Sequence, residues 1–154
     1  MKRGIKLAGI GLAAVLVVIQ FFRPEMNMSP VDPAEDLLMV ASPPGHVADL
    51  IKSSCYDCHS NQTVYPWYSK IAPISWYLKK HIKDGKEDLN VSEYGSMEKV
   101  DKIEFLVDMC EVVEAGTMPL ISFTLIHKAA KLSQEDKEAI CNWSEKEALK
   151  VMKE

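Results

Sequence analysis

Two cysteines and a histidine lie close together in the first half of the chain, at a spacing that suits one kind of chemistry. Cys55, Cys58 and His59 form the pattern C-x-x-C-H, in which positions i, i+3 and i+4 share one face of a helical turn. Two thiols on that face can form thioethers with the vinyl groups of a haem, while the imidazole reaches the iron. The motif therefore predicts one covalently attached haem c, with His59 as the proximal iron ligand.

Other interpretations of the cysteine pair fit the sequence less well. A zinc site needs four ligands, usually from a second closely spaced pair, and Cys110 and Cys141 lie far apart. A thioredoxin-type motif belongs to a βαβ context, and no alternating strand pattern flanks this one. A chance match in a cytosolic protein would lack an export signal, whereas this chain begins with one.

The N-terminus has the pattern of a membrane anchor. A basic start (residues 1–6) precedes sixteen uncharged residues (7–22). At 1.5 Å per residue this helix is about 24 Å long, which is short for a membrane span, but Lys6 and Arg23 can snorkel at its ends. No small-x-small cleavage site follows, so we expect an uncleaved transmembrane helix, with a cleaved signal peptide as the alternative.

The basic residues lie on the N-terminal side of the apolar segment, which places that end in the cytoplasm and the rest of the chain outside. Haem is attached to C-x-x-C-H motifs outside the bacterial inner membrane. We therefore expect a single-pass inner-membrane protein with its haem-binding domain, residues 45–154, in the periplasm. Residues 23–44 hold five of the eight prolines and predict an extended linker; packing of residues 37–40 on the domain is the alternative.

The residues after the linker suit one small all-α domain, because their apolar positions recur at helical spacing. We expect a helix leading from Val47 into the motif, a second at 74–83 broken at Gly85, a third at 98–115 and a last one after Ser133. The third has apolar residues at Val100, Ile103, Leu106, Val107, Cys110 and Val113, followed by a stop at Gly116. A hydroxyl such as that of Ser133 is a favoured N-cap.

A late methionine is the candidate for the second axial ligand. Met118 lies in a Gly-Thr-Met-Pro segment after the third helix, where a rigid loop can hold its thioether toward the iron. His81 and His127 are the rivals and would give a bis-histidine haem of lower potential; an open sixth position is a further alternative. Met109 is expected to pack in the core, and His46 to lie at the surface or to cap a helix.

Further segments accompany the motif over nearly the whole chain: IQFFRP (19–24), CYDCHSN (55–61), YPWY (65–68), IAPISW (71–76), His81, Gly85, Leu89-Asn90, Met118-Pro119 and residues 132–143. Together they resemble the small membrane-anchored haem-binding domain proteins common in Bacteroidetes. The chain order, with C-x-x-C-H on a first helix, a late Met-Pro loop and a C-terminal helix, resembles class I cytochromes c. These resemblances imply a small cytochrome c-like helical domain around a covalent haem, and they name no partner.

Several residues are expected to surround the site. Some of the aromatic residues that follow the motif should wall the haem, and the others should be ordinary core: Tyr65, Trp67, Tyr68, Trp76 and Tyr77. A carbonyl in the loop around Pro66 or Pro73 is expected to accept the His59 Nδ1–H and orient the ring. Cys110 and Cys141 fall on inward helical faces and are first expected to be buried free thiols; a disulfide in an oxidising compartment is the alternative.

Charge and motif content narrow the function. Six lysines face two acids between residues 52 and 86; this is either a solvated face or a lysine-rich rim at the haem edge that steers an acidic redox partner. The net charge of −4 argues against nucleic acid. No set of residues suggests hydrolysis or group transfer.

We expect a monohaem c-type cytochrome that carries single electrons between respiratory partners, not an enzyme. The alternatives are a haem sensor or peroxidase-like protein with an open sixth position, and a non-redox haem subunit of a membrane complex.

Overall fold

The computed structural model describes residues 2–154 and contains helices, turns and a single β-bridge between Met28 and Gln62, with no β-strand in that range. The α-helices are α1 (Lys2–Val18), α2 (Leu37–Val40), α3 (Gly45–Ser54), α4 (Tyr56–His59), α5 (Ile74–Asp88), α6 (Lys99–Glu114), α7 (Ile121–Thr124) and α8 (Gln134–Lys153). Short 3-10 turns are η1 (Ile19–Phe21), η2 (Trp67–Lys70), η3 (Val91–Ser96) and η4 (Lys128–Ala130). The all-α prediction is confirmed; Met1, which belongs to the predicted basic start, lies outside the described residues.

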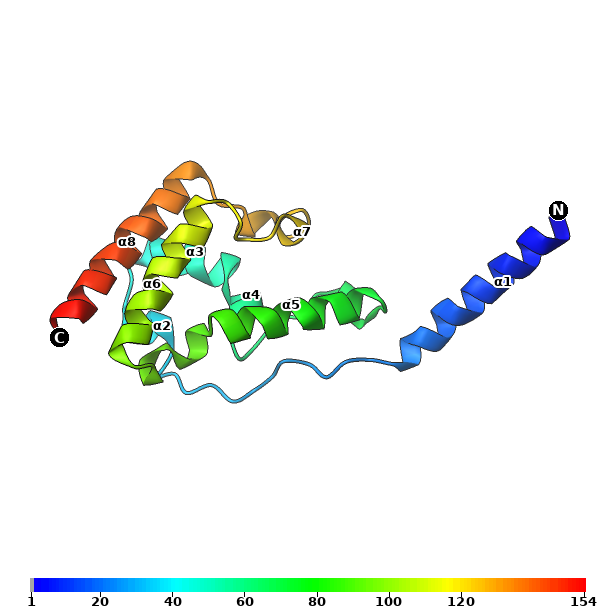
Figure 1. The fold of residues 1–154 in the computed structure, drawn as a ribbon, viewed down its shortest axis with the longest axis horizontal. Helices are drawn as coiled ribbons and strands as arrows, with labels where there is room; N and C mark the ends of the chain where they lie inside the picture. Colours follow the sequence, from blue (N-terminus) through cyan, green and yellow to red (C-terminus); the bar gives the residue numbers. More distant parts are fainter. Residues whose placement is uncertain (1) are drawn as a thin grey trace.

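α1 points away from the other helices (Figure 1) and buries none of its residues. With η1 it forms a 20-residue apolar helix, Lys2–Phe21, which by length and composition could cross a membrane. Its end is attached to the domain by side chains. The Gln20 amide donates to the Ala72 carbonyl and accepts from the Ala72 N–H, both at 3.0 Å, and Trp76 Nε1 donates to the Phe22 carbonyl at 2.7 Å. The apolar helix therefore leaves the domain beside the start of α5.

The proline-rich segment at 23–44 is largely extended and contacts the domain at several places, among them Asn27 and Leu37. The Asn27 side chain donates to the Ser60 carbonyl and to the Thr63 hydroxyl. Leu37, at the start of α2, is fully buried in the hydrophobic core. For residues 37–40 the structure therefore shows the alternative, packing on the domain, because an apolar residue at this position finds a place among other buried side chains.

The main helix pair is α6 and α8, which lie against each other along the C-terminal side of the domain (Figure 1). The predicted third helix is confirmed, but its predicted inward stripe is partly wrong. Val100 and Val107 are exposed, whereas Phe105 and Met109 lie in the core. α8 begins at a capping box, since the Ser133 hydroxyl accepts from the Asp136 N–H and the Asp136 carboxylate accepts from the Ser133 N–H.

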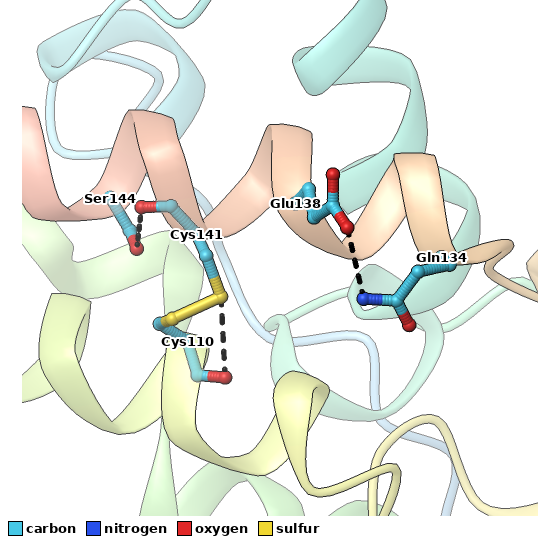
Figure 2. Close-up of a disulfide and its surroundings, with 5 residues drawn as sticks. All are labelled: Cys110, Gln134, Glu138, Cys141 and Ser144. Atoms are coloured by element: carbon cyan, nitrogen blue, oxygen red, sulfur yellow. Dashed lines mark hydrogen bonds between the residues drawn. A yellow bond between two sulfur atoms is a disulfide. The ribbon is translucent and has the colours of Figure 1, made fainter.

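Cys110 of α6 and Cys141 of α8 form a disulfide, with their Cα atoms 4.7 Å apart (Figure 2). The first expectation, two buried free thiols, is therefore wrong. Both cysteines do lie on inward faces, as the sequence indicated, but those faces meet each other closely enough for the two sulfur atoms to bond. The disulfide joins the two helices that contribute most of the core.

α5 is longer than the predicted helix 74–83, because it continues through Gly85 to Asp88. Asp84 forms an ion pair with Lys80 one turn earlier and so supports the helix instead of ending it. Gly85 faces the C-x-x-C-H segment at close range: a Cβ placed there would lie 3.3 Å from the Cys58 carbonyl oxygen. This close packing of helix on helical turn offsets the helix-weakening effect of a glycine.

Candidate functional site

The C-x-x-C-H motif forms one helical turn, as its spacing predicted. The Cys58 and His59 N–H groups both donate to the Cys55 carbonyl, at 3.2 and 2.9 Å. Between the cysteines, the Tyr56 hydroxyl donates to the Asp36 carboxylate at 2.7 Å, and Asp36 also caps α2. The motif is thus attached to the end of the linker segment on one side and continues α3 on the other.

Both cysteines of the motif are free and half-buried. Burial, with a smaller effect of the neighbouring Cys58, raises the pKa of Cys55 to about 12. Burial, with a smaller effect of Asp57, raises the pKa of Cys58 to about 11. At neutral pH both groups are therefore thiols, not thiolates. Two protonated thiols on one turn are the groups that thioether formation with vinyl substituents consumes.

The His59 ring is oriented by a backbone carbonyl at the end of α5. Its Nδ1 lies 3.0 Å from the Leu89 carbonyl oxygen. Since a carbonyl only accepts, Nδ1 carries a proton, and in the neutral imidazole Nε2 then has the free lone pair. The expected acceptors near Pro66 and Pro73 are therefore wrong. The reason is the extension of α5 beyond its predicted end, which brings Leu89 to the imidazole.

Gly85 leaves the space in which the imidazole lies. A Cβ at this position would be 3.3 Å from His59 Cε1 and 3.4 Å from His59 Nε2. The first of these distances is tighter than ordinary van der Waals contact, so any side chain here would press on the Cε1–Nε2 edge of the ring. The glycine is thus a positional requirement of the site and not a helix break.

Met118 is held by the end of α6. Gly116 has a positive φ of 70° and ends the helix, as predicted. The N–H groups of Thr117 and Met118 then donate to the Val112 carbonyl at 3.1 and 3.2 Å. The methionine therefore follows a closed turn whose backbone is tied to the last turn of a core helix.

Two adjoining cavities, of about 210 and 100 Å³, share His59, Asp88 and Met118 in their walls. Cys58 lines the larger cavity and Cys55 the smaller one. The structure thus brings together all four residues that the sequence singled out, although Met118 is about sixty residues from the motif.

The smaller cavity has an apolar wall that includes Val91, Phe105, Met109, Val112 and Val113. Besides His59 and Asp88, the larger cavity is lined by a second histidine, a second aspartate and apolar groups, among them His81, Asp84, Leu120 and Phe123. A haem is a flat apolar ring with one metal at its centre. Apolar walls, two thiols, one imidazole with a free Nε2 and one thioether therefore fit a haem. Met109 is buried, as expected, although it also lines the smaller cavity.

The rival histidines occupy different positions. His127 Nε2 lies 2.7 Å from the Tyr68 hydroxyl, and its ring stacks on Phe123 with centroids 4.2 Å apart. It lines neither cavity. His81 lines the larger cavity and packs against the Tyr77 ring. His46 is exposed, as expected, and lies 3.7 Å from Asp136.

The aromatic run after the motif does not wall these cavities, and none of its members is buried. The expectation that these rings form the core or a wall of the haem site is therefore wrong. The residues concerned are Tyr65, Trp67, Tyr68, Trp76 and Tyr77. Phe105 and Phe123 supply the rings instead. Phe105 lies on the predicted third helix. A second apolar face of that helix is the sequence signal that could have indicated its inward position.

The lysines of α5 lie elsewhere. Lys79, Lys83 and Lys86 line a separate cavity of about 450 Å³. Asp84 and Asp88 are the carboxylates in the larger of the two cavities at His59, and no lysine lines either of them within the described part of the chain. The structure thus does not place the predicted lysine rim at this cavity mouth.

Comparison with known proteins gives one match. The family model of the haem-binding domain matches residues 14–146, a range that begins within α1, ends in α8 and contains all four candidate site residues. Searches of curated proteins and of solved structures gave no match.

Proposed function

This chain belongs to the haem-binding domain family, and we propose that it is a membrane-anchored monohaem c-type cytochrome that carries single electrons. One observation carries the proposal: His59 and Met118 both line the two adjoining cavities, with a motif cysteine in the wall of each. A donor set of imidazole, thioether and two thiols is that of a class I cytochrome c.

Each residue has a defined part in this proposal. Cys55 and Cys58 attach the haem covalently, and His59 binds the iron through Nε2. Met118 completes the coordination and stabilises the reduced state relative to a second imidazole. The haem supplies a one-electron Fe(III)/Fe(II) couple.

The surroundings tune that couple. The Leu89 carbonyl keeps the proton on His59 Nδ1 and fixes the ring. The apolar wall at Phe105 and Val113 excludes water from one side of the site, and low polarity around the iron favours its less charged, reduced form.

The apolar helix supports a single-pass location in the bacterial inner membrane, with the domain in the periplasm. Its basic start favours a cytoplasmic N-terminus. The Cys110–Cys141 disulfide agrees with an oxidising compartment. Partners of such a protein are redox proteins of a respiratory chain. The intact mass of the mature, membrane-fractionated protein tests the anchor: residues before Phe22 should be retained, and a cut between Phe22 and Pro44 would replace the anchor with a signal peptide.

The test of the electron-carrier function is a spectrum of the purified full chain with a redox titration. We expect a reversible one-electron transition, a low-spin spectrum in both states, the weak red charge-transfer band of a methionine–iron bond, and no binding of carbon monoxide. A haem that extracts into acid–acetone would contradict covalent attachment. A high-spin haem that takes up carbon monoxide would contradict the carrier function.

One observation favours a second function. His81 lines the larger cavity together with Met118, so that a displaced methionine would leave an imidazole beside the open position. An imidazole there can accept and return a proton, as a peroxidase-like protein or sensor requires. Rapid reaction with peroxide, lost in His81→Ala but kept in His127→Ala, would support this function over the carrier.

A further inference from the structure

A small cavity of about 170 Å³ lies where the chain leaves α1, away from the cavities at His59. Three cationic side chains, one carboxylate and three hydroxyl groups line it: Arg23, Lys70, Lys79, Glu25, Tyr65, Ser69 and Ser75. The three cations form no ion pair with a carboxylate in residues 2–154. The balance of charge in its wall is therefore positive, which suits a singly charged anion.

The most buried polar side chain of this cavity has no hydrogen-bond partner within the described residues. Ser75 is 2% exposed, and its hydroxyl makes no hydrogen bond within the described residues. A buried hydroxyl that is left unpaired costs free energy. Ser75 belongs to the first turn of α5 and lines the cavity, so an acceptor bound there would satisfy it, with the positive end of the helix dipole behind it.

A second hydroxyl also has a free proton. The Tyr65 oxygen accepts a hydrogen bond from the Asn27 N–H at 2.6 Å, and the hydroxyl donates no hydrogen bond of its own within residues 2–154. The cavity thus offers two O–H donors without acceptors beside three cations. Phosphate oxygens are acceptors that combine with such a set.

The position of the cavity identifies the source of the phosphate. Arg23 lies two residues after the apolar helix Lys2–Phe21, and the preceding residues Gln20 and Phe22 are bonded to Ala72 and Trp76. Two tryptophans near this end of the helix are exposed: Trp67 of η2 (79% exposed) and Trp76 of α5 (40% exposed). Tryptophan is enriched at the membrane–water interface. Lipid phosphates lie just outside the hydrocarbon core, at the depth that a residue following the span would reach.

We propose that this cavity binds the phosphate of a phospholipid headgroup from the leaflet in which α1 ends. The inference rests on the membrane anchoring proposed above and not on the haem chemistry. The bound headgroup fixes the domain against the membrane surface through Lys70, Lys79 and the Ser75 hydroxyl. The orientation of the domain on the bilayer is thereby set at the start of α5, the helix that also carries Gly85.

The test uses the haem-loaded full chain in uncharged detergent micelles and follows its thermal midpoint. A short-chain phosphatidylglycerol should raise the midpoint by ligand binding to the folded state. Diacylglycerol with the same chains, and inorganic phosphate, should do so only at much higher concentration. If inorganic phosphate acts as strongly as the phospholipid, the site takes a free anion and the lipid assignment is wrong. If diacylglycerol acts as strongly, the headgroup is not recognised.

Matched variants make the test specific. The double variant Lys70→Gln/Lys79→Gln should raise the lipid concentration for half-maximal stabilisation roughly tenfold or more. Lys146→Gln/Lys153→Gln changes the net charge equally on α8, at the far side of the molecule (Figure 1), and should not. Equal lipid responses in the two double variants would overturn the proposal.

The serine pair gives a second, independent comparison. Ser75→Ala should weaken lipid binding while leaving the lipid-free midpoint unchanged or higher, because an unpaired hydroxyl is removed. Ser144→Ala removes an equally buried hydroxyl that donates to the Cys141 carbonyl, so it should lower the midpoint and leave lipid binding unchanged. A lower lipid-free midpoint in Ser75→Ala, or unchanged lipid binding, would contradict the role of Ser75. Intact mass shows separately whether the anchor has been cleaved. A wrong anchor assignment can therefore be told apart from a wrong assignment of the lipid site.

Discussion

The two walls of the candidate haem site are built in different ways. One wall comes from α6, whose inward side chains are buried against α8 and whose Cys110 is bonded to Cys141 (Figure 2). The other wall comes from α4, from α7 and the loop before it, and from α5, on which α4 packs. α4 and α7 are helical segments of four residues each. Helices this short are not stable without tertiary contacts.

This difference indicates a division of labour. The α6–α8 wall has buried apolar surface and a covalent link, so we expect it to stay folded when the cofactor is absent. The α4 wall holds two free thiols and a histidine positioned by one carbonyl, and we expect it to depend on the haem for further contacts. We therefore expect changes in the first wall to alter stability, and changes in the second to alter the haem.

The largest effect is expected from the cysteines of the second wall. Cys55→Ala/Cys58→Ala should abolish covalent attachment, because no thiol then remains near the vinyl groups. Haem staining after denaturing electrophoresis measures this directly. The matched control is Cys110→Ala/Cys141→Ala, which removes two cysteines from the first wall and should keep the stain. Covalent haem in the first double variant would contradict the assignment of the motif.

Met118 distinguishes coordination from packing. Met118→Ala should open the sixth position, so that carbon monoxide binding rises from none to stoichiometric and the midpoint potential falls. Met118→His should stay six-coordinate with a lower potential. Met109→Leu, a buried methionine on the first wall, should change neither property. An unchanged spectrum in Met118→Ala, together with a high-spin haem in His81→Ala, would transfer the ligand role to His81.

The disulfide is the main covalent support of the first wall. It closes a loop with a sequence separation of 31, and its removal should lower the free energy of unfolding by about 3–4 kcal/mol by loop-closure entropy. Denaturant unfolding of Cys110→Ala/Cys141→Ala, with the haem still attached, measures this loss. The midpoint potential should stay close to that of the native chain. A potential that shifts as strongly as in Met118→Ala would show that the walls are not independent.

Gly85 tests the contact of α5 with the second wall. An alanine normally stabilises a helix relative to glycine, but here its Cβ would lie 3.3 Å from His59 Cε1. Gly85→Ala should therefore destabilise the haem-loaded protein by roughly 1–2 kcal/mol and shift its potential. Gly45→Ala is the control, because nothing lies within 4 Å of a Cβ at that position. Stabilisation by Gly85→Ala would mean that the ring has room to move.

The smallest effect is expected at the start of α8. Ser133→Ala removes one half of the capping box and should cost about 1 kcal/mol of stability. The visible spectrum should not change, because the cap lies on the first wall. Thermal unfolding followed by circular dichroism, with the spectrum recorded on the same sample, checks both statements.

The candidate site was predictable to the extent that it is local or chemically distinctive. The turn at Cys55–His59 follows from spacing alone, and Met118 follows from its place beside a glycine stop. The Leu89 carbonyl was not predictable, because a backbone acceptor has no signature in side-chain identity. The exposed position of Trp67 and Trp76 was missed for another reason: aromatic residues are expected in a core unless a membrane or partner is known to face them.

The sequence by itself determined the helical class, the apolar N-terminal helix, the helical turn of the C-x-x-C-H motif and the start of α8, since each depends on residues within one or two turns of each other. Only the tertiary structure decided that Cys110 and Cys141 meet, that α5 continues past Gly85 and that Leu89 orients His59. These outcomes depend on which faces of distant helices pack together. That packing is the balance of many small contacts spread over the whole chain, and no local pattern records it.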